Sequence, residues 1–210
     1  MSRSTLAVGD AIKNRESLHV LSDDVQIPDA LVQDIVRDAI LHSPTPFNCQ
    51  SGRTVLLLKE EHKKFWDMAH EVAKAAVAPP VFEKAFEPRI KMFRAAYGTI
   101  LFYESTDALG VIAERMSIVK DKIPQWSEHA NGMLQYAVWT MLTAEGLGVN
   151  LQHYNPMVDS AAAKQWNIPA DWSLKAQMVF GKPAGPRLMK KEFKPVEDRM
   201  MVFGASEDDQ

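Results

Sequence analysis

The segment spanning residues 127–147 restricts the fold more than any other part of the chain. Its spacing predicts a long helix with apolar side chains around most of its circumference: Met133, Leu134, Tyr136, Ala137, Val138, Trp139, Met141 and Leu142. A helix of this kind must be buried on more than one side. We expect it either to be the central core helix or to pack also against a second subunit. The residues alone leave both alternatives open.

Helix and strand patterns alternate along the rest of the chain. Short apolar runs predict strands at 54–59, 98–104, 148–152 and 174–181. Helical spacing predicts helices at 6–14, 27–42, 61–77, 107–122 and 160–166, with a looser, lid-like stretch at 81–94. We expect Pro88 to interrupt that stretch and Pro124 to break the chain before the long helix. Interleaved helices and short buried strands imply one α/β or α+β domain, 1–210, around a central sheet.

Composition and charge exclude several classes of partner. A net charge of −3 and a pI near 6.1 lack the basic excess of a nucleic-acid-binding protein. No segment approaches the roughly 20 apolar residues that a membrane span needs. Cys49, the lone cysteine, has no partner for an intramolecular disulfide, which fits a cytoplasmic protein. His62 and His70 lie two helical turns apart, too far to bind one metal ion, so we expect no metal site.

The loop at 43–53 carries the strongest functional signal. It reads Ser-Pro-Thr-Pro-Phe-Asn-Cys-Gln-Ser-Gly-Arg, between a predicted helix and a predicted strand. Two prolines stiffen it, and Thr45, Asn48, Gln50 and Ser51 can both donate and accept hydrogen bonds. Such a wall suits a planar heterocycle edged with carbonyls and ring nitrogens. Composition alone favours an ordinary helix-to-strand loop.

The order of residues in this loop resembles the Ser-Pro-Ser-Ser-x-Asn-x-Gln segment of the nitroreductase family, in which the loop lines FMN. Residues 126–129 and 150–156 resemble the short subfamily that contains the fungal fatty-acid-repression protein and its bacterial relatives. The resemblance implies an α+β fold with a central, mostly antiparallel sheet flanked by helices. It also implies an intertwined homodimer whose long central helices form the interface.

The resemblance extends to four further places in the chain. Arg15 and Ser17 match residues that approach the flavin phosphate and pyrimidine edge, and a guanidinium fork suits a phosphate. The backbone at Glu145 and Gly146 matches the donor to flavin N5, which stabilises negative charge on the reduced ring. The implied FMN-binding set is Arg15, Ser17, His19, Pro44, Thr45, Asn48, Gln50, Lys91, Glu145, Gly146 and Arg199.

Two acidic residues depart from the family pattern. Glu16 and Glu197 stand where many relatives carry a basic residue. His19 also occupies a usually basic position, and histidine can be neutral near pH 7. These departures weaken the expected hold on the FMN phosphate.

The function that the resemblance implies is an FMN-dependent NAD(P)H oxidoreductase. It would reduce nitroaromatic compounds or quinones by two-electron, ping-pong hydride transfer, with no catalytic side chain beyond the flavin and its backbone donors. The alternative is a flavin-binding redox sensor or regulatory protein in oxidative stress or lipid signalling, with little turnover. A third hypothesis, a structural dimer that has lost FMN, would follow if Glu16 and Glu197 displace the phosphate-binding charge.

Overall fold

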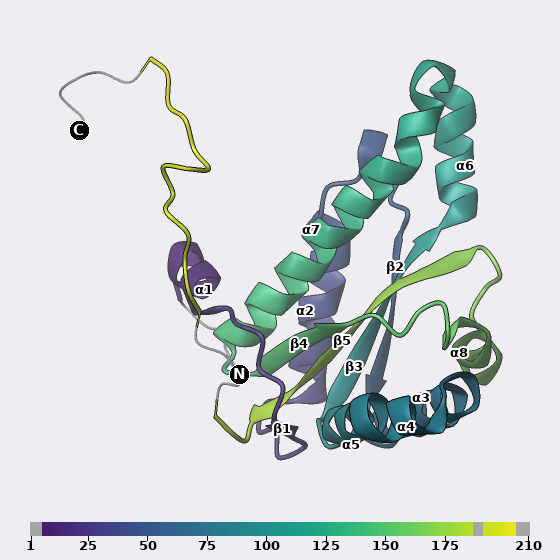
Figure 1. Ribbon diagram of the computed structural model, residues 1–210. Helices are drawn as coiled ribbons and strands as arrows, with labels where there is room; N and C mark the ends of the chain where they lie inside the picture. Colours follow the sequence, from purple (N-terminus) through teal and green to yellow (C-terminus); the bar gives the residue numbers. More distant parts are fainter. Residues whose placement is uncertain (1–5, 187–190, 205–210) are drawn as a thin grey trace.

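The computed structural model describes residues 6–186 and 191–204, which form a five-stranded sheet flanked by helices (Figure 1). The strand order is β1-β5-β3-β2, with β4 also paired to β5, and every pairing between strands is antiparallel. The expected α+β fold with a mostly antiparallel sheet is confirmed. The strands are β1 (Leu21–Ser22), β2 (Gly52–Leu58), β3 (Gly98–Ser105), β4 (Gly148–Gln152) and β5 (Trp172–Pro183).

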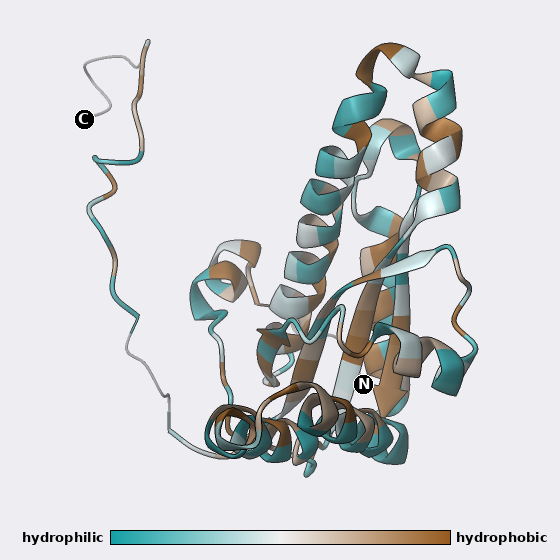
Figure 2. Ribbon diagram, turned by 45° about the vertical axis from the view of Figure 1, so that its right-hand side comes forward, coloured by the Kyte–Doolittle hydropathy of each residue, from teal (hydrophilic) through white to brown (hydrophobic). Residues whose placement is uncertain are grey.

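Two layers of helices cover the two faces of the sheet. On β3, Ile100 and Phe102 face one layer, whereas Leu101 and Tyr103 face the other, as the period of two in a strand requires. The central strands are mostly hydrophobic (Figure 2). Because helices cover both of their faces, their sequences are continuous apolar runs and do not alternate with polar residues. One layer contains α2 (Asp29–His42) and α7 (Ile123–Ala144), and the other contains α3 (Lys59–Ala76), α5 (Glu87–Arg94) and α8 (Asp159–Trp166).

Both prolines expected to interrupt helices stand in the first turns of helices. Pro88 lies in the first turn of α5 and Pro124 in the first turn of α7. A first-turn N–H has no partner within its helix, so proline costs little there. The expected breaks are present, because the π-helical turn ends at Phe86 and a 3-10 turn ends at Lys122, and each proline lies one residue inside the helix that follows. The remaining short elements are α1 (Val8–Asn14), α4 (Pro79–Val81), a π-helical turn (Phe82–Phe86), α6 (Thr106–Arg115) and two 3-10 turns (Pro46–Asn48 and Ser117–Lys122).

The long helix α7 is buried on one face only. The buried side chains include Leu134, Val138 and Leu142, which pack against the sheet and α2. Met133 and Tyr136 lie on the other side and are 46% and 42% exposed. In a single chain α7 is thus the core helix, and part of its apolar surface stays uncovered.

The segment 191–204 lies apart from the sheet in both views (Figures 1 and 2). It exposes several large apolar side chains, among them Met201 at 84% and Phe203 at 90%. The predicted solvated tail, 207–210, lies outside the described residues. Over the described ranges, no helix combines the length and apolarity needed to cross a bilayer.

Candidate functional site

The loop between α2 and β2 is held in an unusual backbone conformation. Phe47, Asn48 and Gln50 have φ angles of 50°, 53° and 50°, a region that residues other than glycine seldom occupy. The Thr45 Oγ1 accepts a hydrogen bond from the Gln50 N–H at 2.9 Å, and the Thr45 carbonyl accepts one from the Asn48 N–H at 3.0 Å. Such strained backbone persists only where surrounding contacts hold it, and it clusters at binding sites.

Thr45, Asn48 and Gln50 line a cavity of about 160 Å³ between the loop and α7. Within residues 6–186 and 191–204, neither the Asn48 nor the Gln50 side-chain amide forms a hydrogen bond, and both residues are exposed. Each amide offers a donor and an acceptor to a ligand. These three residues form the loop half-site.

A second cavity, of about 360 Å³, lies against the same loop. It is lined by Pro44, Phe47, Trp126, His129 and Met133, together with Thr45, Pro46 and Ala130. The rings of Phe47 and Trp126 are 6.1 Å apart, so a flat aromatic molecule would meet aromatic and thioether surface here. Pro44 and Thr45 belong to the set that the resemblance implied, whereas Phe47, Trp126, His129 and Met133 do not, although the resemblance at 126–129 pointed to that segment.

The N-terminal candidates gather at the opposite end of α7. The Arg15 guanidinium carbon lies 4.6 Å from the centre of the Trp139 ring, a cation–π contact. Ser17 pairs with Val149 of β4, and the neighbouring Leu18 N–H donates to the Val149 carbonyl at 2.9 Å. This pairing places the segment beside the start of β4, just after Glu145 and Gly146. Arg15, Ser17, Glu145 and Gly146 form the N-terminal half-site.

The two backbone donors assigned to flavin N5 are turned into the helix. The Glu145 N–H donates to the Met141 carbonyl at 3.2 Å, and the Gly146 N–H donates to the Thr143 carbonyl at 3.0 Å. Gly146 has a φ of 82°, the left-handed conformation that ends many helices. Their role toward N5 stays a prediction. To donate to N5, either N–H would have to share or give up its present hydrogen bond to a helix carbonyl.

His19 is partly buried, whereas Lys91 is exposed to solvent. Burial and the positive Arg89 lower the pKa of His19 below its ordinary value. The Lys91 Nζ instead lies 2.8 Å from Glu87 in an exposed ion pair on α5. Arg89, which the sequence patterns did not single out, is thus the α5 cation that acts on His19.

The structure of one chain does not bring all the candidate residues together. Ala130, beside the loop half-site, and Ala144, beside the N-terminal half-site, are separated by about 20 Å along α7, at 1.5 Å per residue. Figure 1 shows α1 at one end of α7 and α6 at the other. Arg199 lies on the separate segment 191–204, where its Nη2 donates to the Lys194 carbonyl at 3.1 Å.

Other polar groups of the described chain do not form a metal centre. No cluster of three or more histidine, cysteine, aspartate or glutamate side chains suited to a metal ion occurs in 6–186 or 191–204.

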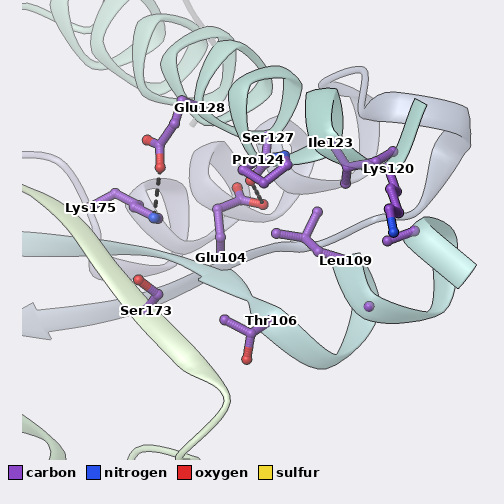
Figure 3. Close-up of a pocket in the computed structure, with 12 residues that line it drawn as sticks. Glu104, Thr106, Leu109, Lys120, Ile123, Pro124, Ser127, Glu128, Ser173 and Lys175 are labelled. Atoms are coloured by element: carbon purple, nitrogen blue, oxygen red, sulfur yellow. Dashed lines mark hydrogen bonds and ion pairs between the residues drawn. The ribbon is translucent and has the colours of Figure 1, made fainter. Parts of the chain in front are cut away.

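A further cavity of about 320 Å³ lies between β3, α6 and α7, beside Glu104 and Ser127 (Figure 3).

The arrangement of sheet and helices is the nitroreductase-like fold, which a nitroreductase-like protein from Bacillus cereus shares at a TM-score of 0.70 and 15% identity. The nitroreductase family model matches residues 12–182, so this chain belongs to the nitroreductase family. Both the resemblance and the fold are confirmed. Membership supports an oxidoreductase activity.

Closer relatives are found in yeast and in a bacterium. Saccharomyces cerevisiae HBN1 is 34% identical over 155 residues, 74% of this chain and 76% of that protein. Nitroreductase FRM2 of the same yeast is 30% identical over 178 residues, 83% of this chain and 86% of that protein. The structure of Lactococcus lactis nitroreductase CinD with nicotinic acid has a TM-score of 0.87 and 36% identity, covering 94% of this chain and 100% of that chain.

Proposed function

We propose that the protein is an FMN-dependent NAD(P)H oxidoreductase that reduces small nitroaromatic compounds or quinones by ping-pong, two-electron hydride transfer. One observation carries this proposal: the free Asn48 and Gln50 amides lie on a strained loop beside a cavity with aromatic walls. Similar structures of CinD hold chloramphenicol and 4-nitrophenol. The family relationship supports the reaction class, and we place the protein in the cytoplasm.

The residues of the two half-sites fit the polar groups of FMN. Asn48 and Gln50 would bond the pyrimidine edge, whose carbonyls and ring nitrogens need both donors and acceptors. Arg15 would bind the phosphate, because in the described part of the chain its guanidinium has an aromatic contact but no carboxylate partner. When bound, FMN supplies the hydride acceptor and donor at N5. Phe47 and Trp126 would stack the substrate and keep water from the exposed ring face.

We also propose that the active unit is a homodimer with FMN at the interface. The pyrimidine edge and N5 belong to one fused ring system, whereas the half-sites assigned to them lie about 20 Å apart along α7. A second, antiparallel copy would bring the loop half-site of one chain to the N-terminal half-site of the other. The uncovered Met133 and Tyr136 on α7, and the exposed apolar side chains of segment 191–204, supply surface for such a contact.

Two measurements test the proposed function. The purified protein should be yellow with non-covalent FMN, and it should oxidise NADH or NADPH when a nitroaromatic acceptor is added. Bound FMN without acceptor-dependent turnover would favour the redox-sensor alternative. A protein that takes up no FMN would favour the structural dimer, for which Glu16 and Glu197 gave the reason. Light scattering should give twice the chain mass of 23.6 kDa, and a stable FMN-loaded monomer would refute the dimer.

A further inference from the structure

Glu104, at the end of β3, is a buried carboxyl group bound only by neutral donors. It is 1% exposed. Its Oε2 accepts hydrogen bonds from the Ser51 hydroxyl at 2.5 Å and the Ser127 hydroxyl at 2.9 Å, and its Oε1 accepts one from the Asn131 amide at 2.7 Å. No lysine, arginine or histidine of the described residues forms an ion pair with it. Figure 3 shows the carboxylate turned toward Ser127 at the start of α7.

A buried carboxylate without a cation is costly, so its three donors have to be held in place. Asn131 is fixed in turn, because its Nδ2 also donates to the Tyr103 carbonyl at 3.2 Å and its Oδ1 accepts from Gln135 at 2.6 Å. An acceptor that takes three donors at once is what an ionised carboxylate provides, and a neutral amide does not. Stability alone does not explain this choice, since an apolar side chain of similar size would avoid the desolvation cost.

The donor Ser51 connects this carboxylate to the loop half-site. Ser51 is fully buried and follows Gln50 directly in the chain. Its carbonyl accepts from the Ser105 N–H at 2.9 Å, and its hydroxyl oxygen lies 3.4 Å from the Cys49 sulfur. Both the backbone and the side chain of Ser51 are therefore tied to the end of β3. The residues with strained backbone, Phe47, Asn48 and Gln50, lie in the chain just before Ser51.

We propose that Glu104 is a positioning residue for the FMN-binding loop and acts through Ser51. The Ser51–Glu104 hydrogen bond holds the end of the loop, and thereby keeps Asn48 and Gln50 in the left-handed conformations that present their amides to the cavity. Hydrogen bonds to an ionised acceptor are about twice as strong as neutral ones, which suits a contact that must oppose backbone strain. The part that concerns FMN rests on the proposed function, whereas the part that concerns loop order does not.

The chain contains a matched control for this proposal. Ser127 donates to the same Oε2 and is also buried, but it comes from α7 and is not part of the loop. Ser51→Ala and Ser127→Ala each remove one hydroxyl donor from the same oxygen. A general loss of stability would follow from both substitutions, whereas loss of loop order would follow from Ser51→Ala alone.

The first measurement is amide hydrogen exchange in full-length protein freed of flavin, at the Asn48, Cys49 and Gln50 N–H groups. In wild type these donate to the Thr45 carbonyl, the Pro46 carbonyl and the Thr45 hydroxyl. Ser51→Ala and Glu104→Gln should speed their exchange tenfold or more, and Ser127→Ala should change it less than twofold. Equal effects of Ser51→Ala and Ser127→Ala would overturn the proposal, and so would unchanged exchange in Ser51→Ala.

The second measurement is FMN binding, followed by the quenching of flavin fluorescence together with the visible spectrum of the bound flavin. Ser51→Ala and Glu104→Gln should weaken FMN binding tenfold or more and shift the spectrum of the bound flavin. Ser127→Ala should leave FMN affinity and the spectrum unchanged, even where it lowers the melting temperature as much as Ser51→Ala does. If Glu104→Gln fails to fold, Ser51→Ala decides the outcome. Wild type that binds no FMN would refute the proposed function, while the exchange result would still decide whether Glu104 orders the loop.

Discussion

His62 should make the protein lose stability in mild acid. The side chain is fully buried, and burial lowers the pKa of His62 to about 4 from an ordinary value of 6.5. The His62 Nδ1 lies 2.8 Å from the Thr99 hydroxyl oxygen, which also accepts a hydrogen bond from the Trp66 indole at 2.9 Å. The His62 Nε2 is buried without a hydrogen-bond partner among the described residues, so a charged ring would be poorly solvated.

The size and sign of the effect follow from proton linkage. Between pH 6.5 and pH 4 the unfolded chain binds a proton at this position and the folded chain does not. The free energy of unfolding therefore falls as the pH falls through this window, and it levels off below pH 4. The difference between 6.5 and about 4, at 1.36 kcal/mol per pKa unit, corresponds to a loss of about 3 kcal/mol at the acid limit.

The assay is urea unfolding between pH 7 and pH 4 at one protein concentration, because a dimer's stability depends on concentration. His62→Gln should be less stable than wild type at pH 7 but should lose less stability between pH 7 and pH 4. His153→Gln, at an exposed position, is the control and should keep the wild-type pH dependence. A His62→Gln variant with the wild-type pH dependence would refute the reasoning.

Three further substitutions test the site and one turn. Arg15→Ala should weaken FMN by about 1.5–3 kcal/mol, the range for a hydrogen bond to a charged group, and should leave riboflavin affinity unchanged; equal losses for both ligands would contradict a phosphate contact. Asn48→Leu, saturated with FMN, should be reduced by NADPH on the order of tenfold more slowly in rapid mixing, and a wild-type rate would mean that Asn48 only shapes the loop. Gly146→Ala should cost about 1 kcal/mol in thermal unfolding, since an added Cβ meets nothing within 4 Å and only the φ of 82° opposes it.

Much of the sheet could be predicted from the sequence, because its central strands β3 and β5 are largely buried on both faces. The runs at 98–104 and 148–152 correspond closely to β3 and β4. The two-residue strand β1 is too short to have a period, and only its pairing with the end of β5 defines it. The prolines marked the helix boundaries, but α7 begins at Ile123, before Pro124, because proline is compatible with the first turn of a helix.

The candidate site was predictable in its residue types but not in its assembly. The polar loop could be read from the sequence because its amides and prolines are adjacent in the chain. Glu104, by contrast, reads as the last residue of an apolar strand, and its donors come from two distant segments, the loop before β2 and α7. Such a buried network depends on tertiary pairing, for which a single sequence contains no local signal.

The separation of the half-sites along α7 leads to a final prediction, based on mixing two defective variants. If each FMN lies between Arg15 of one chain and Asn48 of the other, a mixed dimer of Arg15→Ala and Asn48→Leu chains contains one site with both defects. Its second site is then wild type, because each chain supplies the residue that the other lacks. Random mixing of equal amounts makes about half the dimers mixed, so about a quarter of all sites recover. Refolding the two variants together should restore that fraction of the wild-type activity, whereas mixing without exchange of subunits should not. Activity that never exceeds the average of the two separate variants would mean that each site is built from a single chain.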